Sequence, residues 1–249
     1  MLMQPTIDGL KALKLFGMLT ALESQLQAPD SKALSFEERL GLLVDTELTT
    51  REDRKLQMRL RLAKLPQNGS IENFDTRGTR GIDRAQLLAL ATSDWIRRGQ
   101  NIIIDGPTGV GKSHLASALS HKACRDGFSV HFDRAPRLFQ KLSIARADGS
   151  YSKTLTTIAR KHLLVIDDFG LFPLDAEQRQ DLLEMIEDRS ASLSTIITSQ
   201  FEIDHWHQII GEPTIADAIL DRVVHNSHKL HLSGPSRRKE KAAQMKLAG

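Results

Sequence analysis

The chain has 249 residues, of which 40% are apolar and 26% are charged, with a net charge of +3. These proportions are ordinary for a globular protein, and no apolar run is long enough to span a bilayer. The single cysteine, Cys124, excludes an internal disulfide, and the start of the chain lacks the pattern of a signal segment. We therefore expect a cytoplasmic protein with no membrane partner.

Residues 1–68 show helical periodicity without strand-like alternation. Apolar side chains spaced by three and four form one stripe, made of Leu15, Met18, Leu19, Leu22 and Leu26. A second helix is expected to start at Ser35, which pairs with Glu38 in the pattern of a capping box. Pro66-Gln-Asn-Gly-Ser70 ends this pattern. The sequence therefore predicts a small N-terminal helical domain, 1–68, followed by a domain at 69–249 with a basic tail.

From about residue 71, short β-type runs alternate with helical stretches, such as 134–146 and 175–189. The expected strands are 101–104, 129–132, 163–166, 195–199 and 229–232. This alternation is typical of an α/β fold in which helices sandwich a parallel sheet.

Residues 106–113 read Gly-Pro-Thr-Gly-Val-Gly-Lys-Ser and lie between an expected strand and an expected helix, 113–125. Glycines at these positions let successive backbone N–H groups point at a phosphate, and the helix start adds its dipole. Lys112 is expected to reach the β and γ phosphates, and Ser113 to hold Mg²⁺. The predicted cofactors are ATP and Mg²⁺. The residues predicted to bind the nucleotide here are Gly106, Pro107, Thr108, Gly109, Val110, Gly111, Lys112, Ser113 and His114.

Two further β-type runs end in polar side chains. The apolar run at 163–166 delivers Asp167 and Asp168, of which Asp167 is expected to bind Mg²⁺ and Asp168 to orient the attacking water. The run at 195–199 brings Thr198, Ser199 and Gln200 to the same edge, where they could hydrogen-bond the γ-phosphate or the water. Because the phosphate loop alone also occurs in nucleotide kinases, the second aspartate is what favours hydrolysis.

Arg222 and two basic clusters are candidates for contacts with other molecules. Arg222 is either structural or a charge-stabilising finger that enters the nucleotide site of an adjacent subunit. Residues 51–64 contain six bases and two acids, and residues 229–249 contain six bases and one acid. Such clusters can meet the phosphate backbone of a nucleic acid, although each is equally typical of a solvated helix face or tail.

With these motifs identified, the chain resembles the IstB family of transposition helper ATPases, within the AAA+ class and close to DnaC-type helicase loaders. The matching residues are Trp95-Ile96, 99–101, 106–116, Ala118-Leu119, Gly127, Val130, 163–170, 195–200, Asp221-Arg222 and 234–238. The resemblance implies an ATPase that oligomerises on duplex DNA, with ATP sites shared between subunits, and engages a transposase. Hydrolysis then acts as the assembly switch.

Two positions depart from the common AAA+ pattern. Asp168 stands where many members carry glutamate, which implies slow or partner-stimulated hydrolysis, and Gln200 stands where asparagine is usual. Little chain follows the last expected strand, so Arg238 is the one candidate for a second sensor arginine. Three other functions stay open: a DnaC-like helicase loader, a small-molecule kinase, and a DNA-binding scaffold that holds nucleotide without hydrolysing it.

Overall fold

The computed structural model describes residues 3–66, 69–71, 74, 81–190 and 192–236. The chain separates into two compact units, Met1–Met58 and Arg59–Gly249. The expected boundary followed residue 68, in the break that starts at Pro66, whereas the observed division into two units falls inside the long helix α3 (Phe36–Ala63). The assignment of 1–68 as an adaptor domain and 69–249 as an ATPase domain stays a prediction.

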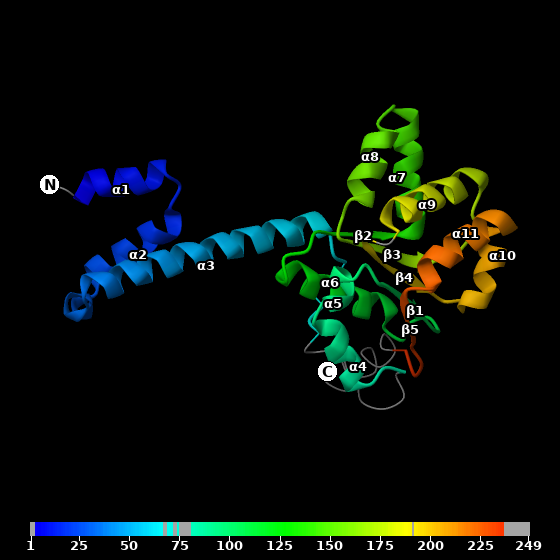
Figure 1. Ribbon diagram of the computed structural model, residues 1–249, viewed down its shortest axis with the longest axis horizontal. Helices are drawn as coiled ribbons and strands as arrows, with labels where there is room; N and C mark the ends of the chain where they lie inside the picture. The colour runs from blue at the N-terminus through cyan, green and yellow to red at the C-terminus, as the bar shows by residue number, and fades with distance from the viewer. Residues whose placement is uncertain (1–2, 67–68, 72–73, 75–80, 191, 237–249) are drawn as a thin grey trace, which may run out of the picture. The chain divides into compact units, whose positions relative to one another are not determined.

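The first unit is helical, as its periodicity predicts. It contains α1 (Met3–Ala12), α2 (Phe16–Gln27), the short 3-10 helix η1 (Pro29–Ala33) and most of α3 (Phe36–Ala63) (Figure 1). The capping box at the start of α3 is confirmed, because the Glu38 N–H donates to Ser35 Oγ at 3.2 Å and the Ser35 N–H donates to Glu38 Oε2 at 2.7 Å. The basic run from Arg51 continues this same helix.

The second unit is built on one five-stranded parallel sheet. Its strands are β1 (Asn101–Asp105), β2 (Val130–Arg134), β3 (Leu163–Phe169), β4 (Ser194–Ser199) and β5 (Ser227–His231). Their order across the sheet is β2-β3-β4-β1-β5, and every pairing is parallel. The five strands expected from the sequence are confirmed, with ends that differ by at most three residues.

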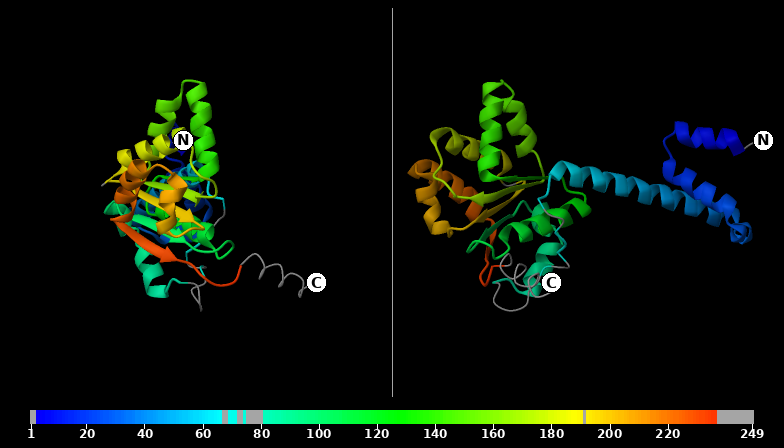
Figure 2. Two further views of the ribbon diagram at one scale, coloured as in Figure 1. Left: turned by 90° about the vertical axis from the view of Figure 1, so that its right-hand side faces the viewer. Right: turned by 180° about the vertical axis from the view of Figure 1, so that it is seen from behind.

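Helices cover both faces of the sheet, as Figures 1 and 2 show. One face carries α4 (Arg84–Ala91), α5 (Asp94–Arg97) and α6 (Lys112–Arg125). The other carries α7 (Ala135–Ala147), α8 (Tyr151–Ala159), α9 (Ala176–Arg189), η2 (Ile203–His205), α10 (Trp206–Ile210) and α11 (Pro213–Val224). None of the helices in the described parts of the chain is long and apolar enough to cross a bilayer.

The central strands are apolar on both faces because each face is covered. Residues 102–104 of β1, 163–166 of β3 and 196–197 of β4 are all buried. The polar residues that follow these runs lie at the carboxyl edge of the sheet. Since parallel strands all end at that edge, β1, β3 and β4 bring their terminal residues together, where ligands bind in open α/β sheets.

Candidate nucleotide-binding site

The phosphate loop connects β1 to α6, as its sequence context predicts. Gly106 and Gly109 have φ values of +133° and +90°, a region that favours glycine. A Cβ on Gly106 would lie 2.0 Å from the Leu232 carbonyl oxygen, and one on Gly109 would lie 2.4 Å from Ser236 Oγ. Gly106 therefore requires glycine on conformational and steric grounds, and Gly109 requires it chiefly because of its φ. Pro107 and Thr108 are exposed on the loop, whereas Val110 is buried beneath it.

Lys112 starts α6 and lies almost wholly inside the loop. Its Nζ donates to the carbonyl oxygens of Gly106 at 2.6 Å and Pro107 at 2.9 Å. Burial lowers the pKa of this ammonium, while the nearby charges of Asp168 and Asp167 act in the opposite direction. The loop carbonyls and the two aspartates thus hold the Lys112 ammonium where the phosphates of ATP require a positive charge.

Asp167 ends the buried part of β3 and faces the start of α6. Its Oδ1 accepts a hydrogen bond from Thr198 Oγ1 at 2.6 Å, and the Ser113 hydroxyl is a second partner. Burial raises the pKa of Asp167, because a charged carboxylate is costly there without a cation. The Ser113 hydroxyl and the Asp167 carboxylate offer the hard oxygen ligands that Mg²⁺ prefers, so these residues fit the predicted metal.

Asp168 occupies an irregular point in β3. Its φ is +57°, and the register of β3 with β4 shifts between Ile166 and Phe169. The Asp168 N–H donates to Thr198 Oγ1 at 3.0 Å, so one hydroxyl serves both adjacent aspartates. Arg134 holds the Asp168 Oδ2 through Nε at 2.8 Å and Nη2 at 2.5 Å.

The remaining residues predicted to bind the nucleotide differ from one another in position and burial. Gln200 is exposed just beyond the end of β4, and Thr198 is fully buried between the two aspartates. His114 stacks its ring against Phe74, with centroids 5.9 Å apart and an angle of 17° between the planes. Arg238 lies outside the described residues.

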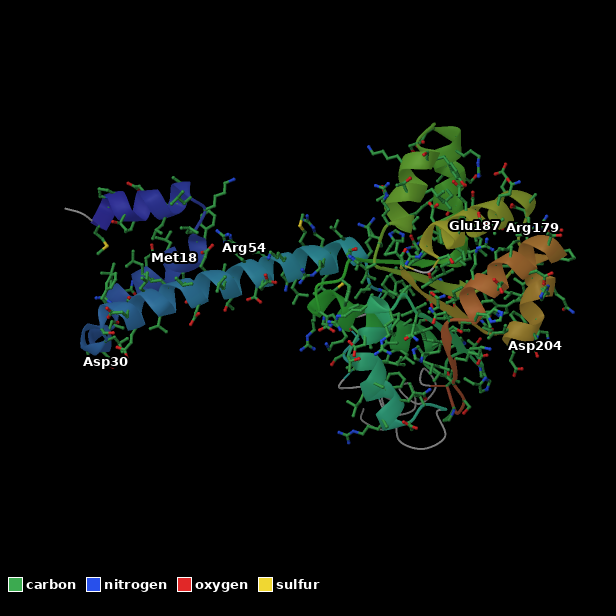
Figure 3. The ribbon with its side chains drawn as sticks, in the orientation of Figure 1. Met18, Asp30, Arg54, Arg179, Glu187 and Asp204 are labelled. Carbon is green, nitrogen blue, oxygen red and sulfur yellow. The ribbon has the colours of Figure 1, made fainter. Side chains whose placement is uncertain are left out.

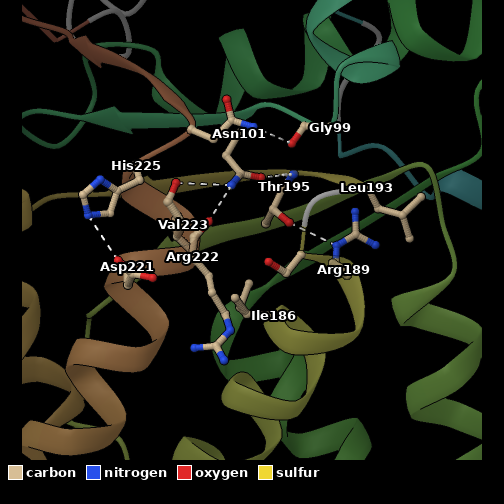
Figure 4. Close-up of a pocket in the computed structure, with 12 residues that line it drawn as sticks. Gly99, Asn101, Ile186, Arg189, Leu193, Thr195, Asp221, Arg222, Val223 and His225 are labelled. Atoms are coloured by element: carbon tan, nitrogen blue, oxygen red, sulfur yellow. Dashed lines mark hydrogen bonds and ion pairs between the residues drawn. The ribbon is translucent and has the colours of Figure 1, made fainter.

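Arg222 lies at the opposite edge of the sheet from the phosphate loop. It is near the end of α11, which leads into the amino end of β5, and β5 pairs in register with the amino end of β1. Its Nη2 contacts Glu187 Oε1 at 3.1 Å, and its Nη1 donates to the Ala218 carbonyl. Figure 4 shows Arg222 beside a pocket of about 240 Å³ with Asn101 on another wall. Arg222 is therefore not brought to the nucleotide site of its own chain.

Three contributors to this site were not predicted from the sequence. Arg134 comes from the end of β2, Phe74 from the segment before the sheet, and Ser236 from the segment after it. Arg134 and Phe74 belong to no short motif, whereas Ser236 lies within the matching stretch 234–238, for which no contact with the phosphate loop was predicted. The place of Arg134 in the site follows from the strand order, which puts β2 beside the aspartate strand β3.

The described residues include no group of three His, Cys, Asp or Glu side chains able to hold a metal by themselves. Mg²⁺ bound with a nucleotide does not need such a group, because it takes one or two protein oxygens and completes its shell with phosphate and water. The arrangement of glycine loop, buried lysine and strand-end aspartates therefore defines a P-loop ATP-binding protein with the AAA+ fold.

Comparison with known proteins gives the family. The family described as IstB-like ATP binding protein matches residues 8–245, and this chain belongs to it. It is 51% identical to the insertion sequence ATP-binding protein y4pL of Sinorhizobium fredii, over 96% of this chain and 98% of that protein. It is 47% identical to the ATP-binding protein of insertion sequence IS1162 of Pseudomonas fluorescens, over 80% and 87% of the two chains.

Solved structures support the fold. The DnaC helicase loader aligns with a TM-score of 0.56 and 22% identity, over 69% of this chain and all of that one. The replication initiator DnaA bound to AMPPCP and single-stranded DNA aligns with a TM-score of 0.57 and 18% identity, over 74% and 56% of the two chains. The predicted family and fold class are thus confirmed, and the chain is an ATP-binding protein of the insertion-sequence type.

Proposed function

We propose that this protein is an ATP-hydrolysing regulator of transposition that assembles on duplex DNA and engages a transposase. The observation that carries the proposal is the shared hydrogen bonding of Asp167 and Asp168 through Thr198, beside Lys112. In this proposal, Asp167 serves the bound cation and Asp168 serves the attacking water. A kinase needs no second carboxylate of this kind for an attacking water.

Each residue has a distinct part in the proposed reaction. The loop amides and Lys112 bind and orient the phosphates, and Ser113 and Asp167 hold Mg²⁺. Mg²⁺, when bound, neutralises charge on the phosphate oxygens. Asp168 accepts a hydrogen bond from the attacking water once Arg134 releases it. Thr198 positions both aspartates through its hydroxyl, and Gln200, exposed just beyond the end of β4, contacts the γ-phosphate or the water.

Arg222 completes the site of a neighbouring subunit in this proposal. Its position at the amino edge prevents action on its own phosphate loop but suits a contact between subunits. An arginine supplied in this way stabilises the charge of the transition state. ATP then joins subunits while it is bound, and hydrolysis releases them.

Basic surfaces supply the proposed contacts with DNA. The segment from Arg134 to Lys161, which includes α7 and α8, contains seven bases and one acid, Asp148. Arg137, Lys153 and Arg160 are exposed on it. Contacts to the phosphate backbone make affinity fall with salt, with a log-log slope of about −0.9 per contact. A double variant, Arg137→Ala with Arg160→Ala, is expected to reduce that slope by about two contacts.

Phosphate release from ATP, measured with and without duplex DNA, tests the proposal. We expect DNA to stimulate the wild type, Lys112→Ala to bind ATP about ten- to a hundredfold more weakly, and Asp168→Ala to bind ATP with little hydrolysis. Bound ATP without release in the wild type would identify a scaffold, and release that needs an acceptor metabolite but not DNA would identify a kinase. Capture of a replicative helicase instead of a transposase would identify a helicase loader.

A further inference from the structure

An apolar pocket of about 120 Å³ lies at the carboxyl edge of the sheet, with Asp168 in its wall. The start of α7 and the segment between β3 and α9 form its apolar lining, which consists of Ala135, Pro136, Phe139, Leu171, Phe172 and Leu174. Three of these residues, Ala135, Phe139 and Leu174, are buried, whereas Phe172 is 70% exposed. We call this site the Phe172 pocket.

Phe172 is the most exposed large apolar side chain in the described chain from α4 onward. The others that are exposed there are Leu88, Ile144 and Phe201. A single exposed apolar side chain is ordinary on a protein surface. Phe172 differs because it adjoins an apolar pocket, and such a pocket is the usual form of a binding site for a small apolar or aromatic group.

The segment that carries Phe172 is held in place by hydrogen bonds to two other elements. The Leu174 N–H donates to the Ile209 carbonyl oxygen at 3.0 Å, and the Leu174 carbonyl oxygen accepts from Arg179 Nη1 at 2.8 Å. Arg179 belongs to α9 and is labelled in Figure 3. The pocket is therefore formed by the chain itself before a ligand arrives, which lowers the cost of ordering it on binding.

The charges around the pocket favour an anion on its α7 side. Arg134 and Arg137 lie on either side of the first two pocket residues in the chain, and both are exposed. The acids on the α9 side are already engaged, because Asp175 caps that helix and Glu177 pairs with Arg146 at 3.1 Å. A ligand that combines an aromatic ring with phosphate groups satisfies both the pocket and the arginines, whereas an apolar protein side chain satisfies only the pocket.

We propose that the Phe172 pocket takes one unstacked base of bound DNA, with the Phe172 ring stacked on the base and Arg134 and Arg137 on the flanking phosphates. This inference rests on the proposed function, because it requires DNA on the surface formed by α7 and α8. Stacking of this kind is tolerant of sequence, because every base has a flat aromatic face. It differs from contacts to the phosphate backbone, which leave the bases stacked.

The Phe172 pocket connects the proposed DNA surface with the ATP site. Asp168, which serves the attacking water in the proposed reaction, is part of the pocket wall, and its partner Arg134 directly precedes the pocket residues of α7. A phosphate beside the inserted base attracts the Arg134 guanidinium and so competes with Asp168 for it. DNA in which a base leaves the stack easily is therefore expected to stimulate phosphate release most strongly.

Binding of two short duplexes, one fully paired and one with a single mismatched pair, tests the inference. Fluorescence anisotropy with an ATP analogue measures affinity without hydrolysis. The wild type is expected to bind the mismatched duplex about tenfold more tightly, because a mismatched base costs less to unstack. Phe172→Ala is expected to lose this preference and to bind the mismatched duplex about five- to a hundredfold more weakly, whereas Phe172→Trp keeps an aromatic ring and the preference.

The matched control is Phe201→Ala, at an exposed phenylalanine outside the pocket, and it is expected to keep the preference. Because Phe172 is largely exposed, its truncation is expected to leave folding intact, which circular dichroism checks. Salt dependence separates stacking from charge. Phe172→Ala is expected to leave the log-log salt slope of DNA affinity unchanged, whereas Arg137→Ala is expected to make it shallower by about 0.9, the value of one phosphate contact.

The outcomes separate this inference from the proposed function. A wild type that binds both duplexes equally, or equal losses in Phe172→Ala and Phe201→Ala, overturns the inference and leaves the proposed contact with the DNA backbone standing. Normal DNA binding by Phe172→Ala together with smaller assemblies shows that the pocket takes a protein side chain, which also overturns it. A wild type that binds neither duplex overturns the proposed contact with DNA as well.

Discussion

Arg134 holds the carboxylate of Asp168 with two nitrogen atoms, at 2.8 and 2.5 Å from the same oxygen. The arginine side chain is 59% exposed, and a pair this open contributes no more than about 1 kcal/mol. The pair is therefore easily broken when new negative charge arrives nearby. In the proposed mechanism, bound phosphates or DNA bring such charge, give Arg134 a second partner and free Asp168 to contact water.

Arg134→Ala is expected to raise hydrolysis in the absence of DNA by about fivefold, the rate equivalent of about 1 kcal/mol. The ratio of DNA-stimulated to basal rate is expected to fall, because Asp168 is already free. Steady-state phosphate release measures both rates. Arg84→Ala, at an exposed arginine of α4, serves as the control and leaves them unchanged. A loss of activity as deep as that of Asp168→Ala would show instead that Arg134 assists the chemistry directly.

Replacing Lys112 tests its contribution to binding the phosphates of ATP. In Lys112→Ala, the carbonyl oxygens of Gly106 and Pro107 lose a charged donor and the phosphates lose their cation. We expect ATP affinity to fall about ten- to a hundredfold, in line with charge-assisted hydrogen bonds. Titration calorimetry with Mg²⁺ measures the change. Lys122→Ala removes a lysine of the same helix that pairs with Asp126, so normal affinity is expected there. Equal losses of ATP affinity in both variants would mean that Lys112 contributes no more to phosphate binding than Lys122 does.

The parts of the site that could be predicted are those formed by residues close together in the sequence. The phosphate loop, the strand-end aspartates and Thr198 follow from a glycine pattern and from apolar runs that stop at polar side chains, and all of them meet at one edge. Arg134 and Ser236 could not be predicted in the same way, because their approach depends on strand order and on the path of the chain after β5. The positive φ of Asp168 likewise results from a register shift between β3 and β4 that no local pattern indicates.

Asp167 is expected to give the protein a characteristic response to pH. Burial raises its folded pKa above 3.8, so the unfolded chain releases this proton first as pH rises. Ionisation of Asp167 therefore lowers the free energy of unfolding as pH rises from 3.8 through the folded pKa. Bound Mg²⁺ offsets this loss of stability by pairing with the carboxylate. Thermal unfolding without and with Mg²⁺ and ATP should show ligand stabilisation that weakens as pH falls through the folded pKa. Asp167→Asn should be more stable than the wild type at neutral pH without ligand, and should gain little from Mg²⁺. If it is less stable there, Asp167 contributes more through its hydrogen bonds to Thr198 and Ser113 than it costs as a charge.

Arg222→Ala tests whether the nucleotide site is shared between subunits. Because Arg222 lies at the amino edge and the phosphate loop at the carboxyl edge, the variant is expected to bind ATP normally but to hydrolyse it about 10³-fold more slowly in the assembly.

A mixture of two variant chains gives the decisive comparison. A chain with Arg222→Ala keeps an intact loop, and a chain with Lys112→Ala keeps an intact arginine, so a mixture forms some complete sites at contacts between the two. We expect phosphate release from the mixture to exceed that of either variant alone. If mixing restores nothing while size measurements show mixed assemblies, Arg222 has only its structural contacts with Glu187 and Ala218.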